Sequence, residues 1–177
     1  MRVIAGTLGG RRLVVPRGQA TRPTAGRVRE ALFSMLGEID GAVVLDLFAG
    51  SGALGIEALS RGAQRATFVE RAPAALAALR ANIAALGLGG RASVVAGDAL
   101  AALRVADNYD LVFLDPPYAT AAGLADALSR DLPAALAPGA RVVSESDRRE
   151  PLALSLPLAR ERRYGDTLIR IHETAHL

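Results

Sequence analysis

Residues 43–62, VVLDLFAGSGALGIEALSRG, form the stretch that decides the fold. The opening VVLDLF is a continuous apolar run of the length expected for a buried strand. Gly50, Gly52 and Gly55 follow at the spacing G-x-G-x-x-G, and the residues after them read as a helix. A strand, a glycine-rich turn and a helix in this order predict the first unit of a parallel βαβ sheet.

Apolar runs and helical stretches alternate from this unit towards the C-terminus. The later strand-like runs are ATFVE, SVVAGD, YDLVFLD and ARVVSE, and the longest helical stretches between them are PAALAALRANIAALG and GLADALSRDLPAAL. Continuous apolar strands separated by helices predict an α/β fold with a mostly parallel sheet covered by helices on both faces. The final runs, RERRYG and DTLIRIHE, predict a C-terminal antiparallel hairpin.

The N-terminal residues predict a separate element. RVIAGTL and RRLVVP are two extended pieces broken at Gly9-Gly10, which suits a β-hairpin with a two-residue turn. A helix should follow, with Thr24 as its N-cap and Gly37 as its stop. We therefore expect a basic hairpin arm over residues 1–23 and an α/β domain over residues 24–177.

Charge is distributed unevenly along the chain. The first 29 residues contain seven Arg and no Asp or Glu, whereas the remainder carries 14 Arg against 18 acidic residues. A basic cluster without acids is typical of phosphate contacts with nucleic acid, although a solvated surface is the alternative for each arginine taken singly. We predict such contacts for Arg11, Arg12, Arg17, Arg22, Arg27 and Arg29, and we consider a second group, Arg160, Arg162 and Arg163, for the same surface.

Composition excludes several other classes of protein. A chain of 177 residues suits one domain, and it contains no Cys for disulfides or thiolate metal sites. It has neither an N-terminal apolar segment of secretory length nor an apolar run long enough to span a membrane. These features predict a soluble, cytoplasmic protein.

Acidic residues stand at the ends of the next predicted strands. Glu70 lies 18 residues after Gly52 and is placed to accept hydrogen bonds from ribose hydroxyls. Asp98 ends the following strand. Because the carboxyl ends of parallel strands meet at one edge of the sheet, these features indicate an adenosine-type cofactor. They do not distinguish NAD from other nucleoside cofactors.

FLDPPY, Phe113 to Tyr118, follows the fourth strand-like segment. The two prolines fix the backbone and remove two donors, so the corner is stiff. The Asp115 carboxylate and the Pro116 carbonyl could then accept the two N–H bonds of an exocyclic base amine. Tyr118 could stack on a base removed from its own stack. The alternative is a rigid corner with a buried aromatic ring.

Together these motifs resemble those of Rossmann-like, class I S-adenosylmethionine-dependent amino-methyltransferases. The resemblance rests on D-x-F-x-G-x-G, which begins at Asp46 and includes Phe48, and on DPPY. It implies that Asp46 and the Gly50–Gly52 loop hold the methionine end, Glu70 the ribose, and Asp98 with the Ala99 backbone the adenine. The expected cofactor set is Asp46, Phe48, Gly50, Gly52, Glu70, Arg71, Asp98 and Ala99, and the expected catalytic set is Asp115, Pro116, Pro117 and Tyr118.

The N-terminal part narrows this resemblance. RVIAGTLGGRRL, TRPTAGRVREALFSML and LGIEALSRGA are similar to segments of the RsmD family of bacterial 16S rRNA guanine-N2-methyltransferases, and the similarity extends over essentially the whole chain. The family implies methyl transfer from S-adenosylmethionine to one guanine of 16S rRNA, on the 30S subunit or an assembly intermediate. It also implies a cytoplasmic enzyme, which we expect to be a monomer. The chain departs from the family in lacking Lys and in its short C-terminus.

Other interpretations stay open from the residues alone. DPPY suits adenine N6 as well as guanine N2, because both amines present two N–H bonds. An NAD-dependent oxidoreductase would rest on G-x-G-x-x-G alone, and a non-catalytic RNA-binding module on the arm alone. HETAH, His172 to His176, matches the zinc motif H-E-x-x-H. Because it starts within a strand pattern and holds both histidines of the chain, we predict no metal site.

Overall fold

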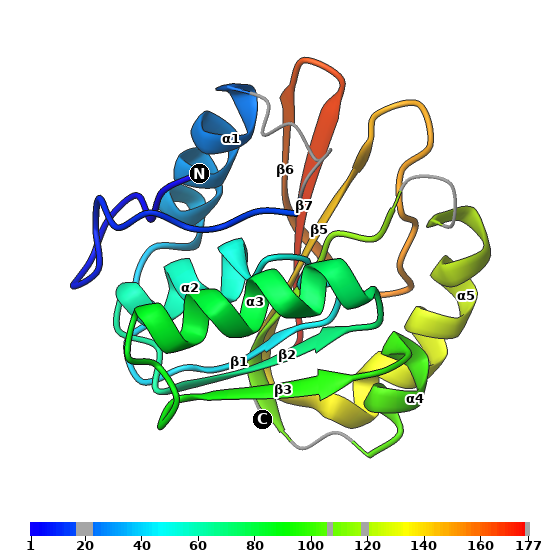
Figure 1. Ribbon diagram of the computed structural model, residues 1–177. Helices are drawn as coiled ribbons and strands as arrows, with labels where there is room; N and C mark the ends of the chain where they lie inside the picture. Colours follow the sequence, from blue (N-terminus) through cyan, green and yellow to red (C-terminus); the bar gives the residue numbers. More distant parts are fainter. Residues whose placement is uncertain (17–22, 106–107, 118–120, 176–177) are drawn as a thin grey trace.

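A computed structural model describes residues 1–16, 23–105, 108–117 and 121–175. In this part of the chain, a seven-stranded sheet has the order β3-β2-β1-β4-β5-β7-β6 (Figure 1). The strand β7 is antiparallel to both its neighbours, and the other pairings are parallel. The strands are β1 (Val43–Asp46), β2 (Arg65–Glu70), β3 (Ala92–Ala96), β4 (Tyr109–Leu114), β5 (Leu136–Asp147), β6 (Leu158–Tyr164) and β7 (Thr167–Glu173). The predicted α/β sheet with a C-terminal antiparallel hairpin is confirmed.

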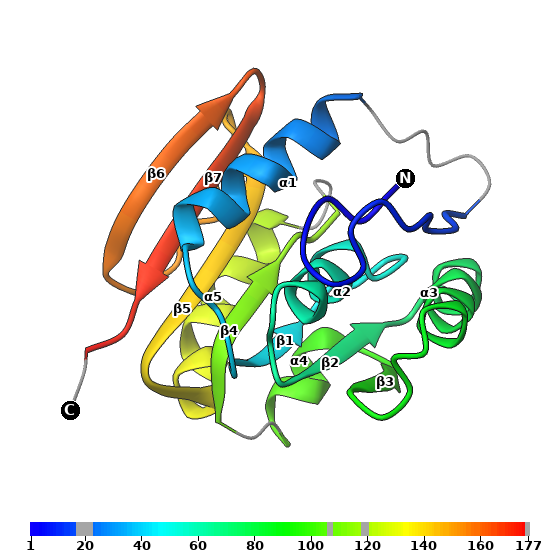
Figure 2. The same ribbon diagram turned by 90° about the vertical axis from the view of Figure 1, so that its left-hand side faces the viewer.

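Helices cover both faces of the sheet (Figure 2). One face carries α1 (Pro23–Leu36), α2 (Ala53–Ser60) and α3 (Pro73–Ala85), and the other carries α4 (Ala99–Leu103), α5 (Ala121–Asp131) and the 3-10 turn η2 (Leu132–Ala135). Successive strand residues point to opposite faces. Accordingly, Val44 belongs to the apolar core under α1, α2 and α3, and Leu45 belongs to the core under α4 and α5.

The helix α1 starts one residue earlier than predicted. Pro23 is its first residue, a position where the missing N–H costs nothing and the fixed φ favours the helix. Thr24 is therefore inside the helix, and the prediction that it caps the helix is wrong. At the other end, Gly37 has a φ of +67° and its N–H donates to the Phe33 carbonyl at 3.1 Å, which confirms the predicted stop.

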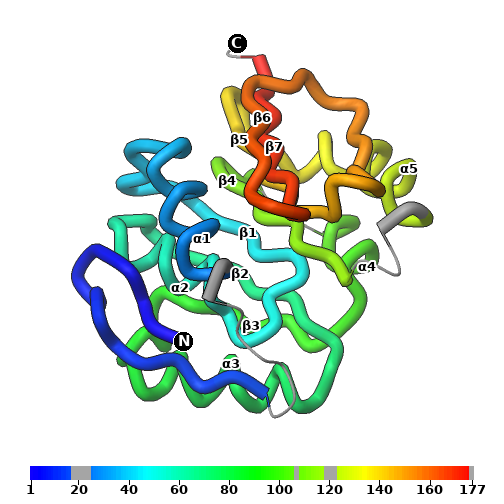
Figure 3. The backbone as a smooth tube through the Cα atoms, turned by 90° about the horizontal axis from the view of Figure 1, so that it is seen from above, coloured from blue at the N-terminus to red at the C-terminus, as the bar shows by residue number. Residues whose placement is uncertain are grey.

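The N-terminal arm is a minimal hairpin that lies beside α2 and α3 (Figure 3). Arg2 and Arg12 form a single antiparallel bridge, extended by hydrogen bonds from Val3 N to Arg11 O and from Gly10 N to Val3 O, both 2.9 Å. The predicted two-residue turn at Gly9-Gly10 is wrong. The connection is longer because residues 4–8 hydrogen bond to α2 instead of to each other.

No described helix is both long enough and apolar enough to cross a membrane.

Candidate active site

A cavity of about 680 Å³ opens where β1, β2, β3 and β4 end. Most of the side chains selected from the sequence line it, which brings the glycine loop, the two acids and the DPPY corner together as predicted. These are Phe48, Gly50, Glu70, Arg71, Asp98, Ala99, Asp115, Pro116 and Pro117. Asp46 and Gly52 lie beneath the loop rather than on the wall, and Tyr118 lies outside the described residues.

The glycine loop has room for a ligand on one side and none on the other. A Cβ at Gly50 (φ +56°) would meet no atom within 4 Å, although this residue lines the cavity. At Gly52 (φ +88°) a Cβ would lie 2.5 Å from the Leu79 side chain of α3, and at Gly55 it would lie 2.3 Å from the Phe68 ring of β2. The first glycine thus leaves space for a ligand, and the other two allow helices and sheet to approach closely.

Asp46 supports the loop from below. It is 1% exposed, and its Oδ2 accepts a hydrogen bond from Gly55 N at 3.0 Å. Burial raises the pKa of Asp46 to about 7, against the lowering effect of the Gly55 bond and with a further rise from Glu70. In this structure Asp46 positions the start of α2, and contact with a cofactor stays a prediction.

Glu70 fixes the other side of the loop. Its Oε2 accepts from Gly50 N at 2.8 Å, and its Oε1 accepts from Arg71 N and Ala72 N at the same distance. The predicted ribose acceptor therefore also determines where the loop lies. Asp98 is the N-cap of α4, since its Oδ1 accepts from Leu100 N and Ala101 N, both at 3.0 Å.

Two carboxyl groups stand close together at the DPPY end of the cavity. Asp115 follows Leu114, which pairs with Ser144 in the parallel register, and Glu145 follows Ser144. Both side chains line the cavity. Protein surroundings raise the pKa of Asp115 well above its usual range, and the nearby Glu145 and Asp46 raise it further. Burial likewise raises the pKa of Glu145.

Glu145 is the site residue that the sequence reasoning missed. The signal was present, because Glu145 is the last residue of the strand-like run ARVVSE. The rule that ligands bind at the carboxyl ends of parallel strands applies to this fifth strand as it does to the others.

The arm and α1 also contribute to the cavity, through Met1, Val15, Ala25 and Val28. Asn82 of α3, 2% exposed, connects the arm to the glycine loop. Its Oδ1 accepts from Val14 N at 2.7 Å, and its Nδ2 donates to Val14 O and Ser51 O, both at 2.9 Å. The arm is therefore a wall of the site as well as a basic extension.

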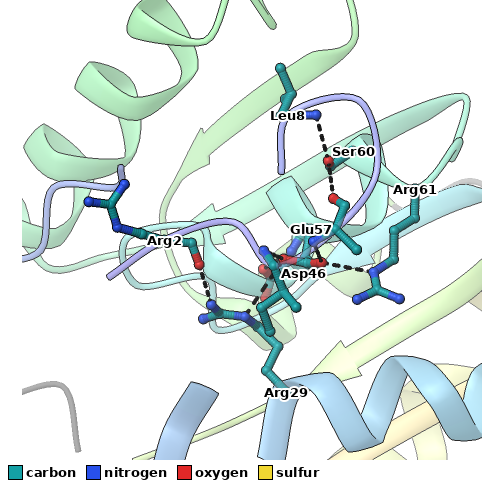
Figure 4. Close-up of polar contacts among 10 residues, drawn as sticks. Arg2, Leu8, Arg29, Asp46, Glu57, Ser60 and Arg61 are labelled. Atoms are coloured by element: carbon teal, nitrogen blue, oxygen red, sulfur yellow. Dashed lines mark hydrogen bonds and ion pairs between the residues drawn. The ribbon is translucent and has the colours of Figure 1, made fainter. Parts of the chain in front are cut away.

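Buried Glu57 of α2 is the centre of the arm's attachment (Figure 4). Its carboxylate accepts from Ile4 N at 2.8 Å, Ala5 N at 3.0 Å and Arg61 Nε at 2.8 Å. Arg29 Nε lies 3.8 Å from the same carboxylate, and Arg29 also donates to the Arg2 carbonyl. Burial lowers the pKa of Arg29, which Glu57 partly offsets.

The arginines predicted to contact RNA divide into groups. Arg11, Arg12 and Arg27 are exposed, and Arg17 and Arg22 lie outside the described residues. Arg29 is 6% exposed and pairs with Glu57, so a phosphate contact for Arg29 does not fit the structure. Charge in an acid-free segment gives no warning that the counter-charge lies 28 residues further on.

The second basic group lies on exposed β6. Arg160 donates to the Met35 carbonyl at the C-terminal end of α1, whereas Ala25 and Val28 at the other end line the cavity. Arg163 is closer, because it pairs with Leu168, next to cavity-lining Thr167. Only part of this group is therefore near the site.

His172 of the HETAH motif lies in β7, 3% exposed, with its Nδ1 3.0 Å from the Leu156 carbonyl. His176 lies outside the described residues. The prediction of no metal site stays a prediction.

A family described as conserved hypothetical protein 95 has a model that matches residues 1–173. Ribosomal RNA small subunit methyltransferase D of Escherichia coli is 46% identical over 120 residues, covering 67% of this chain and 60% of that protein. The chain belongs to the RsmD family. YlbH of Bacillus subtilis, another relative, is 39% identical over 181 residues, 98% of each chain.

Solved structures agree with this membership. The RsmD-family chain superposes on the Escherichia coli protein yhhF with a TM-score of 0.88 at 38% identity, covering 100% of this chain and 99% of that one. An RNA methyltransferase from Salinibacter ruber, solved with S-adenosyl-L-homocysteine, gives a TM-score of 0.67 at 22% identity over 89% of this chain and 95% of that one. The second likeness shows the fold alone, which is that of class I methyltransferases, and the chain is a methyltransferase.

Proposed function

We propose that this protein transfers a methyl group from S-adenosylmethionine to the exocyclic N2 amine of a guanine in 16S rRNA. One observation carries the proposal: the two amine acceptors, Asp115 and Pro116, line the same cavity as the glycine loop and the acids Glu70 and Asp98. A cofactor held by the loop would therefore meet a base held by the DPPY corner.

The residues present fit S-adenosylmethionine. Gly50 leaves open space for a ligand, and the polar lining includes four carboxyl groups, those of Glu70, Asp98, Asp115 and Glu145, against the single charged cation Arg71. Carboxylates accept from ribose hydroxyls and attract a cationic sulfonium, whereas the pyrophosphate of NAD would be repelled by them. When bound, S-adenosylmethionine supplies an electrophilic methyl group.

Asp115 and Pro116 would act on the amine. The lone pair of an exocyclic amine is delocalised into the base, and two acceptors in fixed positions orient the N–H bonds so that the lone pair faces the cofactor. The raised pKa of Asp115 makes its carboxylate a better proton acceptor than an ordinary aspartate. The amine could therefore release its extra proton to Asp115.

The partner is proposed from the relatives and the arm. Relatives from Escherichia coli and Haemophilus influenzae carry the name ribosomal RNA small subunit methyltransferase D. Exposed Arg11, Arg12 and Arg27 suit phosphate contacts. We extend the proposal to the 30S subunit or an assembly intermediate as substrate, and to a monomer acting in the cytoplasm.

The test incubates the protein with labelled S-adenosylmethionine and, separately, unmodified 30S subunits, naked 16S rRNA, 50S subunits or duplex DNA. Digestion then identifies the labelled nucleoside. We expect N2-methylguanosine from 30S subunits or from 16S rRNA. Label in N6-methyladenine would keep the DPPY chemistry but replace the target, because adenine N6 offers the same two N–H bonds. No label in any sample would contradict the proposed function.

Two variants separate catalysis from cofactor binding. Asp115→Ala should retain cofactor affinity, measured by calorimetry, and lose turnover, because Asp115 faces the amine rather than the loop. Glu70→Ala should weaken cofactor binding first, because Glu70 holds Gly50 N as well as facing the cavity. Equal losses of cofactor affinity in both variants would contradict this division of roles.

A further inference from the structure

Glu145 is the one carboxyl of the cavity that the proposed function leaves without a role. It lies beside Asp115 in the parallel register of β4 and β5, and residues in register on neighbouring parallel strands point to the same face of the sheet. Both carboxyl groups and Pro116 line the cavity. No ion pair joins Asp115 or Glu145 to a basic residue within the described ranges.

A guanine held at this corner would present one further donor. Its Watson–Crick edge carries the N2 amine next to the N1–H, and both N–H bonds of the amine are already assigned to Asp115 and Pro116. The neighbouring strand supplies the next acceptor along the cavity wall, Glu145. Adenine bound through N6 would present the N1 lone pair at the same place, and a carboxylate would repel it.

We propose that Glu145 is a specificity-determining residue, which accepts a hydrogen bond from guanine N1–H and disfavours adenine. This inference rests on the proposed function, because it assumes that the DPPY corner holds the amine. It would resolve the ambiguity that DPPY leaves between the two bases. Burial without a basic partner fits the role, because a buried acceptor left without a donor is costly until a ligand supplies one.

The test compares guanine with 2-aminopurine, which keeps the C2 amine and lacks the N1–H. Both are placed at the nucleotide labelled in the assay above, within the same 16S rRNA fragment. The wild-type protein should prefer guanine in kcat/KM by about 10- to 150-fold, the range of a hydrogen bond to a charged group. Glu145→Ala should lose most of that preference, and Glu145→Gln should keep part of it, because the amide oxygen still accepts.

Glu150→Ala is the matched control, because Glu150 is an exposed acid just beyond β5 that does not line the cavity. It should retain the wild-type preference. Calorimetry should show unchanged cofactor affinity in Glu145→Ala. If Glu145→Ala slows both substrates equally, or keeps the preference, Glu145 does not read N1–H. Failure of the wild-type protein to label guanine would instead overturn the proposed function.

Discussion

Asp46 carries a charge in surroundings that oppose it. The carboxyl group is buried beneath the glycine loop with one hydrogen bond, from Gly55 N, and its pKa is about 7. A native pKa above the unfolded value of about 3.9 means that the native state binds the proton more tightly. Stability should therefore fall as pH rises from the unfolded value to the native one, and the full cost is present above pH 7.

Replacing the carboxylate with an amide should remove this cost. Asn at position 46 can still accept from Gly55 N, so Asp46→Asn should be more stable than wild type at pH 8. The advantage should shrink by about 2 kcal/mol at pH 5.5, since each pKa unit corresponds to about 1.36 kcal/mol. Urea unfolding at both pH values measures it. Asp115 and Glu145 titrate in both proteins and cancel from the comparison.

The exposed Asp126 of α5 provides the control, because Asp126→Asn changes the same group on the surface. That variant should show no pH-dependent gain. An Asp46→Asn advantage that is equal at both pH values would mean that burial of the charge is not its source.

Between elements, attachment of the arm to α2 depends on a glycine. Gly6 has a φ of +82°, and a Cβ there would meet the backbone of Ser60. Around it, Thr7 N donates to Ser60 O at 2.8 Å, and Leu8 N donates to Ser60 Oγ at 3.0 Å. These contacts leave no room for a side chain.

Gly6→Ala should therefore detach the arm. Gly10 is a matched control, because its φ is +83° and a Cβ there would meet nothing within 4 Å. Gly10→Ala should cost only the left-handed backbone penalty of about 1–2 kcal/mol. Gly6→Ala should add a clash, and trypsin should cleave after Arg11 or Arg12 about tenfold faster or more, since local opening exposes the site. Equal cleavage rates in the two variants would contradict docking through Gly6.

For the whole molecule, the separation of charge makes a prediction about salt. Basic residues dominate the arm and acidic ones the remainder. We expect RNA binding to weaken steeply with salt, because phosphate contacts release counterions. Arg12→Gln should lower the slope of log affinity against log salt by about 0.7 to 0.9. Arg65→Gln, at the start of β2 and away from the cavity, should leave it unchanged. Equal slopes for all three proteins would count against the arm.

The sequence predicted the sheet and most of the site because these depend on local patterns. Apolar runs mark the strands, and Glu70, Asp98 and Asp115 follow directly after them. The errors came from contacts between distant residues. The turn of the arm is decided by Ser60 and Glu57, and burial of Arg29 by Glu57. No pattern within the first 29 residues contains these partners.

The position of β7 constrains the order in which the sheet can be completed. During synthesis β6 emerges before β7, yet β7 lies between β5 and β6. Because β6 pairs with β7 alone, it has no partner until β7 has been made. The two strands can first pair with each other through the turn at Gly165 and then add to β5 as a unit. Until then the edge of β5 is unpaired and open to association with other chains, so the last strand made also protects the nascent enzyme from aggregation.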